Sequence, residues 1–414
     1  MSVNDPYAAI RVPHFRLLLA GRLIAQIGEQ MVSVAVGWDI YEKTRNPFLL
    51  GMIGLVQVIP VFLFSLPAGV VVDRFNRKRV TLYSQLVLIG CALALTLLSA
   101  TNAPLVFTFV TLAVIGTARA FNNPAEGTLT PLLVPESLYQ SAATWSTAVW
   151  QLSAVTGPAV GGILIGLTGS AVNVYIANAF AGLVLVGALL IIRPRPQKSF
   201  EGGESPIESV KAGLRFLRHN KVILPAITLD MFAVLLGGAI YLLPIYATDI
   251  LQVGAEGLGL LRAALPIGAL SMAIFIANRP PFQNSGRTLL LAVAGFGVVT
   301  IIFGISTNFW LSMAMMVLLG ALDNISVVIR HTLELVFTPD AMRGRIAAVK
   351  SIFIGASNEL GGFESGVAAA ILGPVGAVVF GGVGTLIVVA AVARYAPELR
   401  NLKRITRQRD ASHS

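Results

Sequence analysis

Long apolar stretches recur along the whole chain, and short polar segments separate them. Each stretch is long enough for the ~30 Å hydrocarbon core of a bilayer, which about 20 helical residues cross. Because that core holds no water for the backbone to bind, each spanning segment must be a helix. We therefore expect an all-α membrane protein. Its twelve transmembrane helices are predicted over residues 15–42, 48–72, 80–100, 104–123, 140–168, 172–192, 222–250, 258–277, 288–305, 309–330, 346–371 and 376–396.

Composition agrees with this pattern and narrows the function. Of the 414 residues, 55% are hydrophobic and only 12% are charged, against about 25% in a soluble domain. The one cysteine, Cys91, lies in an apolar run, and the sequence has no nucleotide-binding or metalloprotease motif. We expect no metal, no cofactor and no enzyme activity, and transport that is not driven by ATP hydrolysis in this chain.

The residues that give the net charge of +10 are unevenly distributed among the predicted loops. Almost all Lys and Arg outside the predicted helices fall in alternate loops; Lys43 and Arg45 are the exceptions. The positive-inside rule then places both termini in the cytoplasm of a multi-pass protein. A bacterial inner membrane is the expected location. This alternation explains the basic charge without a nucleic-acid partner, and it supports an even number of helices.

The chain is expected to divide into two six-helix bundles, 1–192 and 222–396, with a cytoplasmic linker at 193–221 and a basic tail at 397–414. The linker ends in an amphipathic helix suited to an anionic lipid surface. The halves repeat weakly at an offset of 204 residues, so that Thr128 aligns with Thr332 and Gly157 with Gly361. Two parallel repeats with a substrate site between them are an architecture typical of secondary transporters.

A basic loop stands between the second and third predicted helices, with the sequence GVVVDRFNRKR from Gly69 to Arg79. It resembles the signature loop of the major facilitator superfamily. Gly69, Asp73, Arg74, Arg77 and Arg79 match that pattern. The resemblance implies a loop that couples the inward and outward states of a transporter. The same loop could otherwise be a generic basic loop, and its counterpart in the second half has lost the motif.

The fifth predicted helix contains TGPAVGG, which resembles the Gly-Pro-x-x-Gly-Gly motif of superfamily antiporters. Gly157, Pro158, Gly161 and Gly162 match it, whereas Ser153 and Ala154 replace upstream glycines of the longer pattern. Small residues with a proline permit close packing and a kink. The resemblance implies antiport, and the departures weaken that implication.

Two longer stretches, Phe15 to Thr44 and Met342 to Gly366, look like the enterobactin-exporter-like branch of the superfamily. That resemblance implies a secondary active transporter. It would export small amphipathic molecules, either siderophores or drug-like compounds, by proton antiport with alternating access. A monomer with protons and membrane lipids as partners is expected. The alternatives are an importer or lysolipid flippase of the same fold, or a receptor that does not transport.

Ionisable residues inside a membrane are costly and usually face a cavity. In the first predicted helix, Arg22, Gln26, Glu29 and Ser33 share one helical face. They predict either an interior ion-pair network or a cavity wall in which Glu29 carries the proton. Opposing effects of burial and of a nearby arginine can poise such a carboxyl group for reversible protonation.

Further candidates lie in the second half and on the fifth helix. Asp230, which aligns with Gln26 in the repeat, and Glu359 are the other expected proton-coupling residues. Asn358 and Glu364 from the eleventh helix, and Trp145 from the fifth, are expected in the substrate cavity. Trp38, Trp150 and Tyr241 are further aromatic candidates for a flat substrate. Aromatic residues also mark membrane interfaces, so Trp145 and Trp150 could serve there instead.

Overall fold

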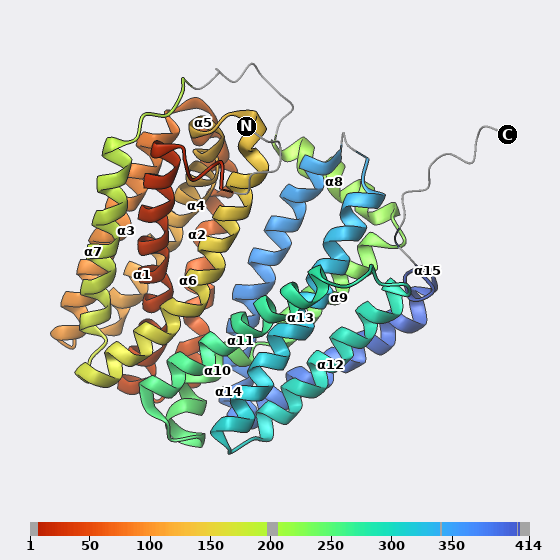
Figure 1. Cartoon of the computed structure of the whole chain (residues 1–414). Helices are drawn as coiled ribbons and strands as arrows, with labels where there is room; N and C mark the ends of the chain where they lie inside the picture. The colour runs from red at the N-terminus through yellow and green to blue at the C-terminus, as the bar shows by residue number, and fades with distance from the viewer. Residues whose placement is uncertain (1–6, 197–205, 340–341, 404, 406–414) are drawn as a thin grey trace. The chain divides into compact units, whose positions relative to one another are not determined.

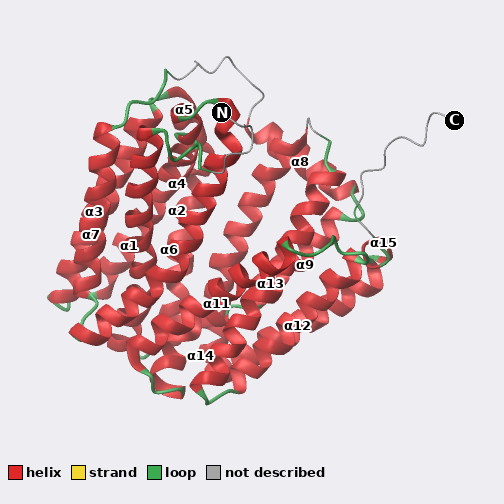
Figure 2. Ribbon diagram, in the orientation of Figure 1, coloured by secondary structure: helices red, strands yellow, loops and turns green. Residues whose placement is uncertain are grey.

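The computed structural model describes residues 7–196, 206–339, 342–403 and 405. The described chain is helical with short connections and contains no strand (Figure 2). The helices are α1 (Pro13–Thr44), α2 (Pro47–Arg74), α3 (Arg77–Ala100), α4 (Leu105–Gly127), α5 (Thr130–Leu133), α6 (Tyr139–Thr168), α7 (Val172–Ile191), α8 (Pro206–His219), α9 (Ile223–Leu236), α10 (Ala239–Ile245), α11 (Gly254–Ala277), α12 (Ser285–Ile305), α13 (Phe309–Phe337), α14 (Arg343–Tyr395) and α15 (Pro397–Arg400). A π-helical segment, Tyr246–Ile250, follows α10.

Polar residues in the short connections set several helix boundaries. The side chains of Asn46, Asn76 and Asn308 accept hydrogen bonds from backbone N–H groups in the first turns of α2, α3 and α13. Such caps satisfy donors that have no partner inside the helix. At the other end of α6, Gly169 takes a left-handed conformation (φ 67°) that glycine adopts without strain. The turns are therefore encoded locally, between apolar segments.

Ten helices within the described residues are long and apolar enough to cross a membrane. The first expected span is not among them, because Arg22, Gln26 and Glu29 make α1 more polar, although α1 is 32 residues long. The last two expected spans, 346–371 and 376–396, lie in the 53-residue α14, which consists of two helices joined across a kink at the non-helical Gly373 (φ 74°, ψ 164°). At ~1.5 Å per residue, α14 is far longer than one bilayer crossing. The number of twelve crossings stays a prediction.

Some helices differ from their expected bounds. α4 continues past Pro124 to Gly127, beyond the predicted end at 123. The seventh expected span is divided at Gly237 and Gly238 into α9 and α10. A side chain at Gly238 would collide with Ser365 of α14, so the division occurs where two helices approach closely. Hydropathy does not register such contacts between distant segments.

The Cα positions form two compact units. The first contains the described part of Met1–Gly203 together with Leu243–Ala263; the second contains the described part of Glu204–Leu242 and of Ala264–Ser414. The segment Leu243–Ala263, from the second half of the sequence, thus belongs to the first unit. The predicted division into two six-helix bundles rests on the sequence repeat and on the expected membrane topology. It stays a prediction.

Within the first unit, α1 packs on α6 and α7, α2 packs on α4, and α3 packs on α4 and α7 (Figure 1). Within the second unit, α14 packs on α12 and α9, and α13 packs on α12. The expected amphipathic helix is α8. Its Gly213 and the buried Leu217 lie against the start of α14, where they contact Arg345, Ile346 and Val349. The first part of the expected linker, 197–205, lies outside the described residues.

Candidate functional site

Arg22 of α1 and Glu126 of α4 form a buried ion pair in the first unit. The Arg22 guanidinium also donates to the backbone carbonyl of Glu126 and, over 3.2 Å, to the hydroxyl of Thr130. The amide of Asn122 donates to the second carboxylate oxygen of Glu126 at 3.2 Å. Both charged groups are therefore held by several hydrogen bonds, as a charge inside a membrane requires.

A second ion pair joins the same two helices. A carboxylate oxygen of Glu29 lies 3.8 Å from Nη2 of Arg119 on α4, and Arg119 also donates to the side-chain carbonyl of Gln57 at 3.1 Å. Arg22 and Glu29 stand two turns apart on α1, and Arg119 and Glu126 two turns apart on α4. The partners follow in opposite order because the helices run antiparallel. The ion-pair partners of Arg22 and Glu29 thus both lie on α4.

Two cavities in the first unit lie beside these ion pairs. The larger, of about 410 Å³, we call the Arg22 cavity; it is lined by Arg22, Gln26, Asn123, Glu126, Gly127, Ser146, Thr147, Val149 and Trp150. The smaller, of about 20 Å³, we call the Glu29 pocket. Glu29, Gln85, Arg119 and Asn178 form its polar wall. The pocket has room for roughly one water molecule. Arg22 and Glu29 therefore face different spaces, although they share a helical face.

The aromatic wall of the Arg22 cavity is Trp150, which is 54% exposed. Trp145 packs instead against Tyr7, with ring centroids 5.9 Å apart, and against the apolar core at the start of α1. Five positions turn a helix by about 140°, so the two indoles point in different directions. Ser33, the last member of the expected stripe, accepts a hydrogen bond of 2.9 Å from Arg262 of α11.

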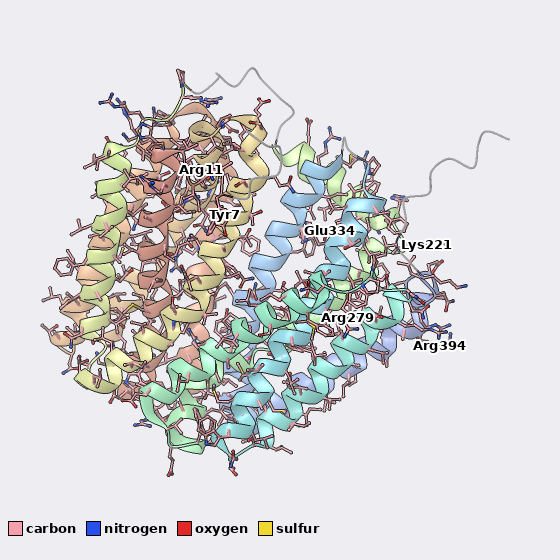
Figure 3. All side chains as sticks on the ribbon, in the orientation of Figure 1. Tyr7, Arg11, Lys221, Arg279, Glu334 and Arg394 are labelled. Carbon is pink, nitrogen blue, oxygen red and sulfur yellow. The ribbon has the colours of Figure 1, made fainter. Side chains whose placement is uncertain are left out.

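In the second unit, Asp230 of α9 forms an ion pair with the buried Arg330 of α13. Asp323 stands two turns before Arg330 on α13. Close by, Lys350 of α14 donates to a carboxylate oxygen of Glu334 at 2.7 Å. Figure 3 labels Glu334 on α13. Asp230, Asp323, Arg330, Glu334 and Lys350 form what we call the second-unit cluster.

The two units carry related ion pairs of opposite polarity. At the repeat offset of 204 residues, Gln26 aligns with Asp230, and Glu126 aligns with Arg330. In the first unit the base lies on the first helix of the repeat and the acid on the fourth; in the second unit the acid lies on the first and the base on the fourth. The residues on the fourth helices align, whereas on the first helices Arg22 lies one turn before the position that aligns with Asp230, and the charges are exchanged.

The remaining candidates are Asn358, Glu359 and Glu364 on α14. Asn358 is exposed and Glu359 is partly buried, and both have interactions with other residues. Glu364 accepts a hydrogen bond of 3.4 Å from Ser365, the residue packed against Gly238. The assignment of these three residues to coupling and cavity roles stays a prediction.

The basic loop from Gly69 to Arg79 connects α2 and α3. Asp73 lies 3.9 Å from Arg77, one turn further along, whereas Arg74 and Arg79 are exposed. Lys78 donates to the backbone carbonyls of Leu190 and Ile192, at 3.2 and 2.8 Å. Since those carbonyls have no partner within α7, Lys78 caps that helix and ties it to the start of α3.

The glycines of the TGPAVGG segment make close helix contacts. A Cβ at Gly157 would lie 2.9 Å from the carbonyl oxygen of Ile27, and one at Gly161 would lie 3.0 Å from Cα of Met31, so α6 lies directly on α1. A Cβ at Gly162 would lie 2.7 Å from Cα of Gly259 on α11. Pro158 stands within the helix without ending it. These residues act in the structure as packing surfaces.

Sequence reasoning missed Glu126 as a cavity residue. Glu126 fell outside the predicted fourth helix because Pro124 and two asparagines lower the hydropathy there. A usable signal was present. The two-turn spacing of Arg119 and Glu126 repeats that of Arg22 and Glu29 in the same order, Arg before Glu. Two antiparallel helices with this shared order bring each Arg opposite a Glu.

The chain matches a protein family described as "Transmembrane secretion effector" over residues 4–412. Relatives include the enterobactin exporter EntS of Shigella boydii serotype 4 and that of Escherichia coli. Each is 27% identical over 406 residues, which cover 97% of this chain and 96% of the relative.

Solved structures share the fold. A bacterial homolog of the human lysosomal transporter Spinster superposes with a TM-score of 0.71 at 13% identity, covering 96% of this chain and 99% of that one. The POT family transporter PepTSo superposes with a TM-score of 0.72 at 11% identity, covering 94% and 98%. The predicted all-α transporter fold and the family resemblance are thereby confirmed. The chain belongs to the transmembrane secretion effector family of the major facilitator superfamily and is a multi-pass transporter of the inner membrane.

Proposed function

We propose that this transporter exports a small amphipathic molecule by proton antiport with alternating access. Its relatives over nearly the whole length are enterobactin exporters, which supports export of a siderophore or of a drug-like compound of similar character. In the superfamily fold, the same protein exposes its site to one side of the membrane and then to the other. An inward proton movement would drive the substrate outward.

The Arg22 cavity is the observation that carries this proposal. It combines a buried ion pair with amide and hydroxyl groups and an exposed indole. A pocket with a few placed polar groups and an aromatic surface is typical of small-molecule binding. Trp150 offers a flat apolar face, and Gln26 and Asn123 offer hydrogen bonds. Such a lining suits a substrate that has both an aromatic and a polar part.

Proton coupling needs an acid that exchanges its proton during the cycle. Glu29, Asp230 and Glu359 are the candidates from the sequence, and the first two form ion pairs with arginines on a neighbouring helix. Protonation of either acid would release its arginine and loosen a helix contact. The loop at Asp73 and the glycines from Gly157 to Gly162 would pass such a change to the surrounding helices.

The proposal is tested in proteoliposomes with an imposed pH gradient. A fluorescent aromatic efflux substrate and a catecholate serve as probes, with empty liposomes as the control. We expect the probe to move against its concentration gradient, and an uncoupler to stop that movement. Uphill transport that continues without a proton gradient would contradict antiport. Uphill movement with the proton gradient, in the direction of the protons, would indicate an importer, and movement of a lysolipid alone would indicate a flippase.

A further inference from the structure

The guanidinium group in the Arg22 cavity is already satisfied by the protein. It faces the carboxylate of Glu126, donates to the backbone carbonyl of the same residue, and donates to the hydroxyl of Thr130 at 3.2 Å. These contacts bring each of its three nitrogens against a protein oxygen, and the Arg22 side chain is only 9% exposed. Arg22 therefore stands in the cavity wall without offering an open site for an anion.

The hydroxyl groups in the wall also donate to the protein. Ser146 donates to the backbone carbonyl of Ala142 at 2.9 Å, and Thr147 donates to that of Ala143 at 3.0 Å. A hydroxyl group has one hydrogen and two lone pairs, so each oxygen keeps its capacity to accept. Both residues thus line the cavity as hydrogen-bond acceptors.

A further acceptor in the wall belongs to Gln26, one turn along α1 from Arg22. Its side-chain carbonyl oxygen is buried and receives no hydrogen bond from the part of the chain that the structure describes. A buried carbonyl oxygen without a donor is costly, and an N–H or O–H group of a ligand would remove that cost. Gln26 therefore points to a ligand that donates.

The charges in the cavity wall cancel. Among the described residues that line the cavity, Arg22 and Glu126 carry charge, and they pair with one another. An anion or a cation would each disturb that pair, but a cation would also gain the face of Trp150, since an indole ring attracts positive charge. About half of Trp150 is exposed. The lining therefore favours a neutral or cationic group over an anionic one.

We propose that the Arg22 cavity binds aromatic molecules whose polar part is a neutral or singly cationic hydrogen-bond donor, such as a phenol or an amine. This inference rests on the proposed export and narrows its substrate class. The aromatic ring lies on Trp150, and the donor group binds the carbonyl oxygen of Gln26. The volume of about 410 Å³ suits one molecule of drug size. A protonated catechol or an amine meets these requirements, whereas a carboxylate does not.

Naphthalene probes of similar size test the ligand class on the purified full-length protein. Naphthol is a neutral donor, methoxynaphthalene lacks the donor, naphthylmethylamine is cationic at neutral pH, and naphthoate is anionic. Equilibrium dialysis in detergent, with protein-free micelles as the blank, gives the dissociation constants. We expect naphthol and naphthylmethylamine to bind about tenfold more tightly than the other two, the effect of about one hydrogen bond to a buried acceptor. Equal binding of all four probes, or tightest binding of naphthoate, would overturn the proposal.

Variants of two lining residues assign the preference to this cavity. Gln26→Leu removes the acceptor, so the advantage of naphthol over methoxynaphthalene should disappear. Gln26→Glu adds a carboxylate, so the amine should bind more tightly and naphthoate more weakly. Trp150→Ala should weaken the binding of every probe. Trp310→Ala, which removes an exposed indole at the start of α13, is the matched control and should bind like the parent. Binding that is unchanged in the Gln26 and Trp150 variants would show that the probes bind elsewhere.

Transport of the same probes separates this inference from the proposed function. If naphthol and naphthylmethylamine bind with the expected dependence on Gln26 and Trp150 but no pH gradient drives them across a proteoliposome membrane, the proposed antiport fails and the ligand class stands. If a pH gradient drives export of naphthoate as well as it drives export of the amine, the ligand class fails and antiport stands.

Discussion

Arg45 and Asp249 occupy equivalent positions in the two halves of the sequence and form an ion pair with one another, with Nη1 of Arg45 lying 2.8 Å from Oδ1 of Asp249. Tyr41 donates its hydroxyl proton to the same carboxylate, and the Arg45 guanidinium lies over the Tyr41 ring, 5.5 Å from its centroid. Both charged side chains are about half exposed. The contact fastens the end of α10 and its π-helical segment to the end of α1 within the first unit.

Reversing one charge of this pair should release the segment. Arg45→Asp places two carboxylates together, while Arg45→Asp with Asp249→Arg restores the attraction. Ala247, which is fully buried in the π-helical segment, reports on the change as Ala247→Cys in a Cys91→Ser background. We expect faster thiol labelling with the single reversal and protection again with the double one. Exposed pairs are worth at most ~1 kcal/mol, so thermal stability should change little. Equal labelling in all three proteins would contradict this role.

Breaking the ion pair between Arg22 and Glu126 should destabilise the fold. Glu126→Gln leaves the buried guanidinium without its carboxylate, and loss of one partner of a buried pair typically costs about 3–5 kcal/mol. Thr130→Val removes only one hydrogen bond to the same guanidinium, and about 1–2 kcal/mol is expected for it. Thermal unfolding in one detergent compares the two variants with the parent. Similar unfolding temperatures for Glu126→Gln and Thr130→Val would show that the ion pair adds little.

Close packing of α6 on α11 predicts a position-specific effect of a single methyl group. A Cβ at Gly162 would lie 2.5 Å from the carbonyl oxygen of Ala255, so Gly162→Ala should force the helices apart and cost about 1–3 kcal/mol. Gly90 of α3 has no heavy atom within 4 Å of its Cβ position. As the matched control, Gly90→Ala should be neutral or stabilising by up to ~1 kcal/mol. Unfolding temperatures measure both, and equal effects would deny the close contact.

The distribution of Lys and Arg predicts which loops face the cytoplasm. In a Cys91→Ser background, Ser170→Cys between α6 and α7 should react with a membrane-impermeant thiol reagent in intact cells. Arg195→Cys, just beyond α7, should react only after the membrane is permeabilised. The reverse result would invert the topology and place both termini outside the cytoplasm.

Glu29 should behave as a structural residue if the coupling proton binds in the second unit. Glu29→Gln leaves Arg119 with Gln57 but removes its ion pair, so the yield of folded protein and the unfolding temperature should fall. Transport normalised to folded protein should keep the parent's pH profile. A flattened profile would return Glu29 to the proton path, and the Glu29 pocket would then be its route to water.

The fold was predictable because hydropathy and turn residues are local signals. Apolar stretches located the helices, and the short polar segments between them gave their order. The break between the predicted spans 346–371 and 376–396 was among the features located, since the backbone is non-helical at Gly373. Two features escaped this reasoning for physical reasons. The end of α4 can hold the charged Glu126 because Arg22 of α1 neutralises it. The division between α9 and α10 occurs beside Gly238, which packs against Ser365 of α14, and hydropathy carries no sign of that contact.

The site was predictable only in part. The polar stripe from Arg22 to Ser33 on α1 was visible in the sequence. Which cavity each of its residues faces depends on the partners that other helices supply, and the sequence of α1 does not contain that information. Arg22 and Gln26 line one cavity and Glu29 another, because α4 supplies a base opposite Glu29 and an acid opposite Arg22. The choice between Trp145 and Trp150 likewise depended on Tyr7, which lies outside the predicted helices and covers Trp145.

The opposite polarity of the two buried ion pairs also bears on how the chain assembles. Repeats of similar sequence risk pairing the wrong helices while they come together in the bilayer. An α1 that packed on α13 would set Arg22 beside Arg330, and an α9 that packed on α4 would set Asp230 beside Glu126. Each error would bring like charges together where the dielectric constant is low and repulsion is strong. The exchanged charges thus label each first helix for its own fourth helix, and they make the two halves distinguishable to one another during folding.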